Sequence, residues 1–252
     1  MHAEVKGTTM PHLEVILDQG EYIISAHGEL SWMTPNIALS QTTGTGGAGG
    51  GGGGLMGALK RAVGGGGIFL TRYESTGGQG MICFATKVPG RIFPVEISPT
   101  AVYMVHRHGW LCGTPGVVPT MAFQQTFRGG LWGGDGFILQ KLEGQGTAWI
   151  ELSGEITTYD LQPGQTMMAH PGHVGMYSST VSFTVQRLPG IMNRAFGQDG
   201  AHLAVLTGPG QIWLQSMPLP ILGHAVQPYV ATEAVGAGAA GGLLGGALGG
   251  RL

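Results

Sequence analysis

The residues of this chain whose type and spacing are best suited to chemistry are four histidines. His106 and His108 are two residues apart in "VHRHG", and His170 and His173 flank a turn in "HPGH". Alternate residues of a β-strand point to the same face, so His106 and His108 would present two imidazoles side by side. Imidazole nitrogens are good ligands for Zn, Fe, Cu and Ni. These four residues are therefore the candidate metal ligands of the chain.

Two interpretations of the histidines remain open. In a cupin-type site, a His-x-His pair is joined by a carboxylate a few residues later and by a distant histidine, a place that His173 would take. Here "GWLCGTPG" follows His108 and holds no carboxylate. In the other interpretation the histidines flank turns of an internal repeat, in which His27 and His170 occupy equivalent places. We predict no bound metal or cofactor, and a cupin-like metal-dependent enzyme using His106, His108 and His173 is the alternative.

Other residues that could act in catalysis have structural explanations. Asp135 and Asp199 precede glycines in two corresponding loops, where an aspartate commonly bonds its own backbone. Cys83 and Cys112 lie among apolar residues, whereas a reactive thiolate requires an electropositive, partly exposed setting. We expect both to be core thiols without a disulfide. The sequence contains no Gly-x-Ser-x-Gly nucleophile elbow. We predict no catalytic residue and no enzymatic activity.

A glycine-rich insertion, "GTGGAGGGGGGLMGALKRAVGGGG", occupies residues 44–67. A phosphate-binding P-loop would place Gly-Lys-Ser or Gly-Lys-Thr between a strand and a helix. Here Lys60 follows a leucine and precedes an arginine, so no nucleotide site is expected. The insertion instead predicts one apolar helical turn with a basic end, a candidate interaction loop made of Leu55, Met56, Leu59, Lys60 and Arg61. Such a turn suits a protein partner or a membrane surface.

The chain ends in a Gly/Ala-rich segment, residues 231–252. Gly242, Gly246 and Gly250 have the small-x-x-x-small spacing that favours helix packing in membranes. Glycine, however, costs a helix about 1 kcal/mol relative to alanine. We expect a flexible tail, with self-association or bilayer contact as the alternatives.

The composition favours an all-β fold. Charged residues make up 10% of the chain and 49 residues are glycine, which indicates many turns and short strands. The net charge is −2 and the basic residues are scattered, so the clustered positive charge that binds nucleic acids is missing. No signal peptide or long apolar run is visible.

One sequence pattern occurs three times. "VGGGGIFLTRY", "WGGDGFILQKL" and "FGQDGAHLAVL" each place an apolar residue before Gly-x-x-Gly and a strand, and a Gly-x-Gly turn with a second strand follows. Because glycine reaches positive φ at no steric cost, we predict three β-hairpins across these turns. They define units of about residues 11–86, 87–152 and 153–217 in a single domain over 1–230. We expect a pseudo-threefold, closed β-sandwich or barrel of antiparallel strands.

Seven segments resemble, in order, the altered-inheritance-of-mitochondria protein 24 family, also called the mitochondrial biogenesis family. They include "LEVILDQGE", "GGGLMGALKR", "VPGRIFPVEI" and "DLQPGQTMMAHPGHV", and they extend from about Pro11 to Gln215. The resemblance implies a fold similar to that of the tryptophan RNA-binding attenuation protein (TRAP-like), without transferring RNA binding. It implies no catalytic residues. Because no presequence is visible, we expect a cytoplasmic, prokaryotic member.

The predicted function is a non-enzymatic, homo-oligomeric scaffold or interaction protein. Its expected partner is a further copy of itself, with a second protein or a membrane surface as additional partners and no nucleic acid. A peripheral membrane-organising protein is the third interpretation, after the cupin-like enzyme.

Overall fold

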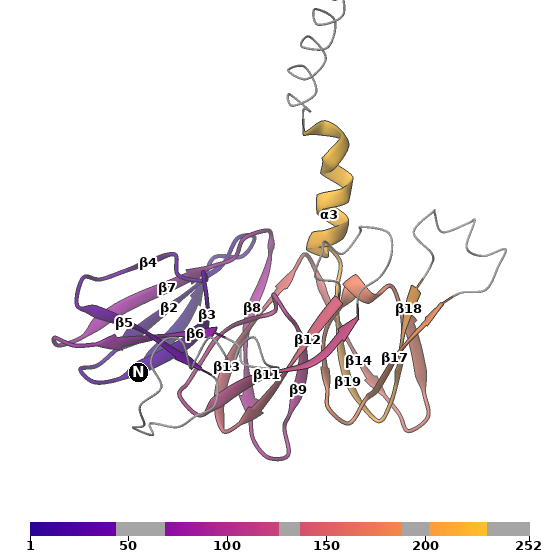
Figure 1. Ribbon diagram of the computed structural model, residues 1–252, viewed down its shortest axis with the longest axis horizontal. Coiled ribbons are helices and arrows are strands. Elements are labelled where there is room, and N and C mark those ends of the chain that lie inside the picture. Colours follow the sequence, from indigo (N-terminus) through magenta and orange to yellow (C-terminus); the bar gives the residue numbers. More distant parts are fainter. Residues whose placement is uncertain (44–68, 126–136, 188–201, 231–252) are drawn as a thin grey trace, which may run out of the picture.

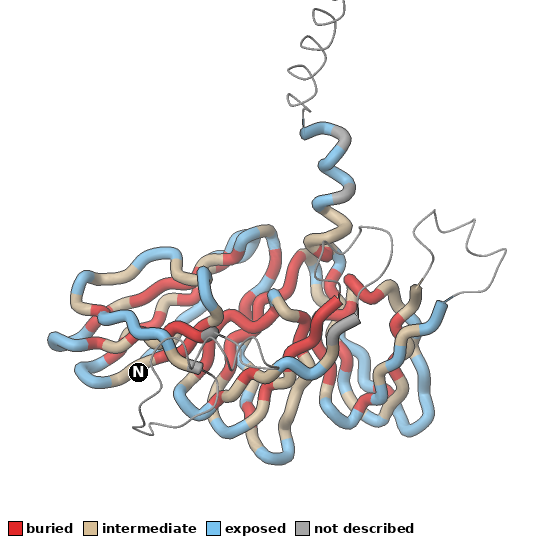
Figure 2. Tube along the Cα trace, viewed as in Figure 1, coloured by how far each residue is buried: buried red, intermediate tan, exposed pale blue. Residues whose placement is uncertain are grey.

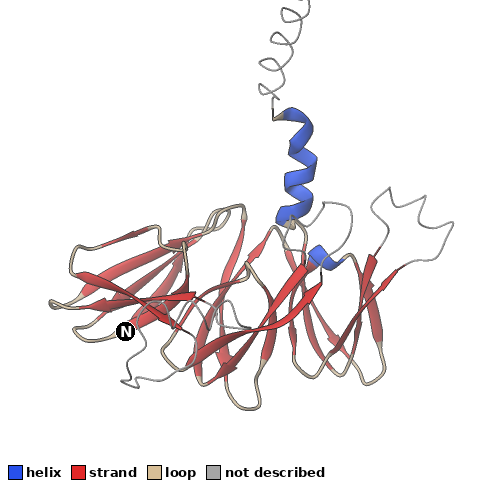
Figure 3. Ribbon diagram, viewed as in Figure 1, coloured by secondary structure: helices blue, strands red, loops and turns tan. Residues whose placement is uncertain are grey.

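The computed structural model describes residues 1–43, 69–125, 137–187 and 202–230. Over these residues the protein consists mainly of antiparallel β-strands, as Figure 3 shows. The other elements are α3 (Leu219–Val226), which projects away from the strands, and the 3-10 turns η1 (Pro171–His173) and η2 (Gln227–Tyr229). The all-β prediction is confirmed. The glycine-rich insertion, the interaction loop and the tail lie outside the described residues.

The first two sheets contain the first eight strands of the described chain and two later ones. The first sheet has the order β1 (His2–Lys6), β2 (His12–Leu17), β7 (Gly80–Ala85) and β4 (Trp32–Met33). The second has the order β5 (Ile37–Thr43), β6 (Phe69–Ser75), β3 (Tyr22–Ala26), β10 (Trp110–Gly113), β13 (Gly146–Ser153) and β8 (Gly90–Ile97).

The other two sheets contain the remaining strands. The third sheet has the order β11 (Val117–Gln125), β12 (Phe137–Gly144), β9 (Tyr103–His106), β16 (Val174–Ser178), β19 (Gly210–Gln215) and β14 (Ile156–Leu161). The fourth has the order β15 (Thr166–Ala169), β18 (His202–Thr207) and β17 (Ser182–Arg187).

The four sheets stack along the long axis of the molecule, with β4 near one end and β18 near the other (Figure 1). Three apolar cores fill the spaces between consecutive sheets. Core 1 joins strands of the first and second sheets, core 2 the second and third, and core 3 the third and fourth. Buried segments accordingly run through the interior of the stack, and exposed ones form its rim (Figure 2).

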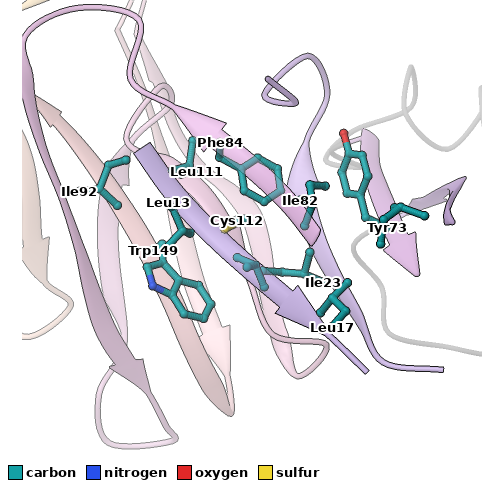
Figure 4. Packing of buried hydrophobic residues seen from close by; sticks show 12 residues of the cluster. Leu13, Leu17, Ile23, Tyr73, Ile82, Phe84, Ile92, Leu111, Cys112 and Trp149 are labelled. Carbon is teal, nitrogen blue, oxygen red and sulfur yellow. The ribbon is translucent and has the colours of Figure 1, made fainter. Parts of the chain in front are cut away.

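Alternating sequence patterns build these cores. β2 reads "HLEVIL", and its leucines and valine are buried while the residues between them are partly exposed. Figure 4 shows Leu13 and Leu17 of β2 packed in core 1 with Phe84 of β7 and with Ile23 and Trp149 of the second sheet. Apolar burial of this kind contributes about 1.5–3 kcal/mol for each large side chain.

The predicted hairpins across the Gly-x-Gly turns are wrong. β6 pairs with β3 and β5, whereas β7 pairs with β2 and β4. Each Gly-x-Gly turn therefore carries the chain from one sheet into the neighbouring sheet. Glycine is needed for the close passage, because a Cβ on Gly144 would lie 2.2 Å from the Gly116 carbonyl oxygen. Among the described strands, the consecutive pairs that do form hairpins are β1–β2, β5–β6, β11–β12 and β17–β18.

The predicted closure is also wrong for the part of the chain that the structure describes. Each of the four sheets has two edge strands. Stacking buries both faces of the two middle sheets, so these faces are covered without curling a sheet into a barrel. No described helix has the length and apolarity needed to cross a membrane.

Candidate functional site

His106 ends β9 as a buried side chain, with 7% of its surface exposed. Its ring lies 5.8 Å from that of Phe137 and 5.5 Å from that of His108, measured between ring centroids. Burial, together with the nearby His108 and Arg107, lowers the pKa of His106 to about 3. The imidazole is therefore neutral at physiological pH, and its Nδ1 lies 3.5 Å from the backbone N–H of His108.

The second predicted histidine pair flanks η1. His170 accepts a hydrogen bond at Nδ1 from the Gly172 N–H at 3.4 Å, which caps the turn. His173 Nδ1 lies 2.7 Å from the Gln215 carbonyl oxygen. Burial, and secondarily His173, lower the pKa of His170. The His170 imidazole thus contacts the backbone of its own turn, and the His173 imidazole contacts the backbone at the end of β19.

The described part of the chain does not gather the predicted histidines into a metal-binding group. The one group of three His, Cys, Asp or Glu residues found there consists of His12, Glu14 and Cys83, whose ligand atoms all lie within 4.8 Å of one another. His106, His108 and His173 do not form such a group within these residues. The sequence analysis missed the new group because Cys83 reaches Glu14 only through the β2–β7 register. The His-x-Glu alternation of "HLE" was its only local signal.

The group lies on the face of the first sheet that points away from core 1. Glu14 is paired with the Lys6 ammonium at 2.7 Å, and the His12 ring lies 5.2 Å from the Trp32 ring. Cys83 is fully buried, and burial followed by the charge of Glu14 raises its thiol pKa to about 11. Imidazole, carboxylate and thiolate together suit a zinc-like ion. Binding would have to release the thiol proton and displace Lys6 from Glu14.

The two cysteines lie in separate places and are free thiols, as predicted. Cys112 is fully buried in core 1, and burial raises its pKa well above the ordinary value for a thiol. Asp135 and Asp199 lie outside the described residues. The same holds for the interaction loop Leu55, Met56, Leu59, Lys60 and Arg61, so its contact with a partner or a membrane stays a prediction.

Comparison with known proteins gives a family and a fold. A family model described as Mitochondrial biogenesis AIM24 matches residues 3–217. No curated protein matches the chain. Among solved structures, the crystal structure of a Streptococcus pyogenes protein, determined as a structural genomics target, matches with a TM-score of 0.71 and 24% identity. The match covers 91% of this chain and 99% of that chain. At this identity it establishes the fold alone.

Proposed function

Since this chain belongs to the mitochondrial biogenesis AIM24 family, we propose that it acts as a non-enzymatic, homo-oligomeric scaffold built from three equivalent β units in a TRAP-like arrangement. The observation that carries the proposal is the sharing of sheets between consecutive units. Each unit contributes three strands to each of two neighbouring sheets. Three strands of the adjoining unit complete such a sheet. Self-association then extends a contact that the chain already makes within itself.

The order of strands supports three units. The second sheet joins β5-β6-β3 to β10-β13-β8, and the third joins β11-β12-β9 to β16-β19-β14. Each strand of the second sheet has a counterpart in the third sheet whose label is higher by six, as β11 is to β5. The first sheet holds β4-β7-β2 and the fourth holds β17-β18-β15, which are the two unmatched halves of the same pattern. The units would then be strands β2–β7, β8–β13 and β14–β19, close to the boundaries expected from the sequence.

A recurring side-chain contact supports the same division. In each unit, the last strand begins with a glycine. The backbone N–H of the next residue donates a hydrogen bond to the hydroxyl of a threonine or serine. The contacts join Thr34 to Met81 at 3.0 Å, Thr114 to Thr147 at 3.0 Å and Ser178 to Gln211 at 3.3 Å. Each hydroxyl residue also begins a turn, because its carbonyl accepts from the N–H three residues later.

The test is the subunit number of the purified, full-length protein. Native mass spectrometry and light scattering over the micromolar range should give a discrete oligomer or a polymer. A monomer throughout that range would contradict the scaffold proposal.

A metal-binding role is the second candidate, supported by the proximity of His12, Glu14 and Cys83. Zinc titration of the wild-type protein, followed by calorimetry, should give one site that His12→Ala removes. His2→Ala is the control, since His2 is an exposed histidine of the same sheet. Identical titrations for wild type and His12→Ala would exclude this site.

A further inference from the structure

β4 and β15 are edge strands at the two ends of the stack. Within the described residues, β4 pairs with β7 alone and β15 pairs with β18 alone. Both carry a large apolar side chain in solvent: Trp32 is 46% exposed and Met168 is 50% exposed. Because an uncovered strand edge presents unpaired N–H and C=O groups, it is a template for another strand.

Two strand junctions inside the chain show how such edges are filled. β3 pairs with β10, and β9 pairs with β16, both antiparallel. The opposed residues are Ser25 and Cys112, Ile24 and Gly113, then Val105 and Met176, Met104 and Tyr177. Both junctions thus join the second strand of one unit to the third strand of the next.

β4 corresponds to β10 and β16. Each lies beside the last strand of its unit, and that last strand begins with a glycine. In each case one residue lies opposite the third residue after this glycine. These pairs are Trp32 with Cys83, Cys112 with Trp149, and Met176 with Trp213. Cys112 and Met176 are fully buried, whereas Trp32 is 46% exposed. Among the described residues, β4 therefore lacks the neighbour that covers its two counterparts.

β15 corresponds in the same way to β3 and β9. Thr71 of β6, Gln140 of β12 and Ala204 of β18 occupy corresponding places in the three units. They lie opposite Ser25, Val105 and Ala169, respectively. Met168 thus occupies the position of Ile24 and Met104. Ile24 is buried in core 2, but Met168 is half exposed. In the part of the chain that the structure describes, β15 likewise lacks the neighbour that β3 and β9 have.

We propose that β15 of one copy pairs with β4 of a second copy, antiparallel, with Ala169 opposite the second copy's Trp32 and Met168 opposite its Met33. This register is the one that both internal junctions use. The inference rests on the homo-oligomeric function proposed above and names its interface. Because the two surfaces differ, the association is head-to-tail and gives a ring if the rotation closes, or a filament if it does not.

The face around Trp32 also fits this interface. In core 1, Ile92, Cys112 and Trp149 of the second unit extend the packing of the first unit. In core 2, Ile156, Met176 and Trp213 of the third unit do the same for the second. Their counterparts in the first unit are His12, Trp32 and Cys83, on the face that points away from core 1. Within the described chain, no fourth unit adds such residues to core 3. In the proposed pairing, this face of the second copy would lie at the edge of core 3 of the first copy.

Two charge substitutions test the interface, each with a matched control. Trp32→Glu and Met168→Lys place a charge in the proposed contact, and should weaken association about a hundredfold or more, since a central apolar anchor is lost. Tyr159→Glu and Met121→Lys alter side chains of similar exposure, 41% and 47%, on β14 and β11. These controls should retain the wild-type subunit number. Circular dichroism spectra of all four variants should match that of the wild type, which checks that they are folded.

Mixing the two variants tests the head-to-tail direction. Trp32→Glu keeps an intact β15 and Met168→Lys keeps an intact β4, so an equal mixture should form a heterodimer and stop there. Met33→Cys mixed with Met168→Cys should likewise give a disulfide-linked dimer that neither variant gives alone, because directly opposed residues in a sheet lie within disulfide reach.

The outcomes separate this inference from the scaffold proposal. A wild-type oligomer that persists in both Trp32→Glu and Met168→Lys would overturn the β15–β4 interface and leave the scaffold intact. Monomeric variants whose mixture stays monomeric would overturn the head-to-tail pairing. A monomeric wild type would overturn both proposals.

Discussion

Cys112 lies directly opposite Trp149 across β10 and β13, and the first sheet holds the same pair with the sides exchanged, Trp32 on β4 opposite Cys83 on β7. Sulfur–aromatic contacts are worth about 0.3–1.5 kcal/mol. The cysteine is on β10 and the tryptophan on β13 in the second sheet, whereas the tryptophan is on β4 and the cysteine on β7 in the first sheet. Both strand pairs thus place a cysteine across from a tryptophan.

Glu151 is expected to make stability fall with rising pH. It is 7% exposed, and burial raises its pKa from 4.5 to about 7, although the Lys87 backbone N–H donates to it at 3.2 Å. Between these pH values the folded state binds more protons than the unfolded state, so the free energy of unfolding decreases as pH rises. Glu151→Gln should remove this decrease and stabilise the protein above pH 7 by about 3 kcal/mol at most.

An equivalent contact made by a glutamine already exists in the protein. Gln215 Oε1 accepts from the Ser153 N–H at 3.0 Å, as Glu151 does from Lys87. Urea unfolding below pH 4.5 and above pH 7 measures the effect. Glu155→Gln is the control, because the Glu155 side chain is 81% exposed. Equal pH profiles for wild type and Glu151→Gln would contradict the assignment.

His106 is expected to act in the opposite direction, on the acid side. Its pKa is lowered from 6.5 to about 3 by burial, so below pH 6.5 the unfolded state takes up a proton that the folded state excludes. The free energy of unfolding therefore falls as pH decreases through this window. His106→Leu should reduce the fall by about 2 kcal/mol or more. Thermal unfolding at several pH values checks this, with the exposed His2→Leu as control. A His106→Leu slope equal to that of wild type would refute it.

Gly146 should tolerate no side chain. Its φ is 144°, and a Cβ there would lie 2.0 Å from Thr114 Oγ1, the atom that accepts from the Thr147 N–H. Gly146→Ala should therefore lower the free energy of unfolding by about 3 kcal/mol. Gly78→Ala is the matched control, since Gly78 has a φ of 73° and open space around a Cβ. It should cost about 1–2 kcal/mol. Equal losses in urea denaturation would show that the Thr114 contact is unimportant.

The two native thiols should be protected from reagents. Cys83 and Cys112 are fully buried with raised pKa values, and thiolate is the reactive form. Labelling with an aromatic disulfide should be slow in the native protein and complete after denaturation. Met121→Cys, at a position 47% exposed, provides a fast-reacting reference. Rapid labelling of the native wild type would contradict this burial.

The sequence predicted the all-β class because glycine-rich turns and alternating segments such as "HLEVIL" are local signals. It did not predict which strands pair. The Gly78–Gly80 turn has the sequence of a hairpin turn, but its two strands enter different sheets. Apolar side chains of both strands pack in core 1 between these sheets, and the local sequence does not show this packing. The His12–Glu14–Cys83 group was missed for the same reason, since its members meet only through the register of β2 and β7. Cys83 and Cys112 were placed correctly because their apolar surroundings are local.

The pairing of β3 with β10 has a consequence for protein synthesis. The Ser25 hydroxyl donates to the Leu111 carbonyl at 2.8 Å, across 86 residues of chain. A ribosome adds about 5–20 residues per second, so this gap corresponds to a delay on the order of ten seconds. During that time the first half of the second sheet has left the ribosome, but the edge of β3 that pairs with β10 is not yet hydrogen-bonded. Nascent chains of this protein therefore pass through a period of vulnerability to mispairing, and chaperone contact is expected to concentrate there.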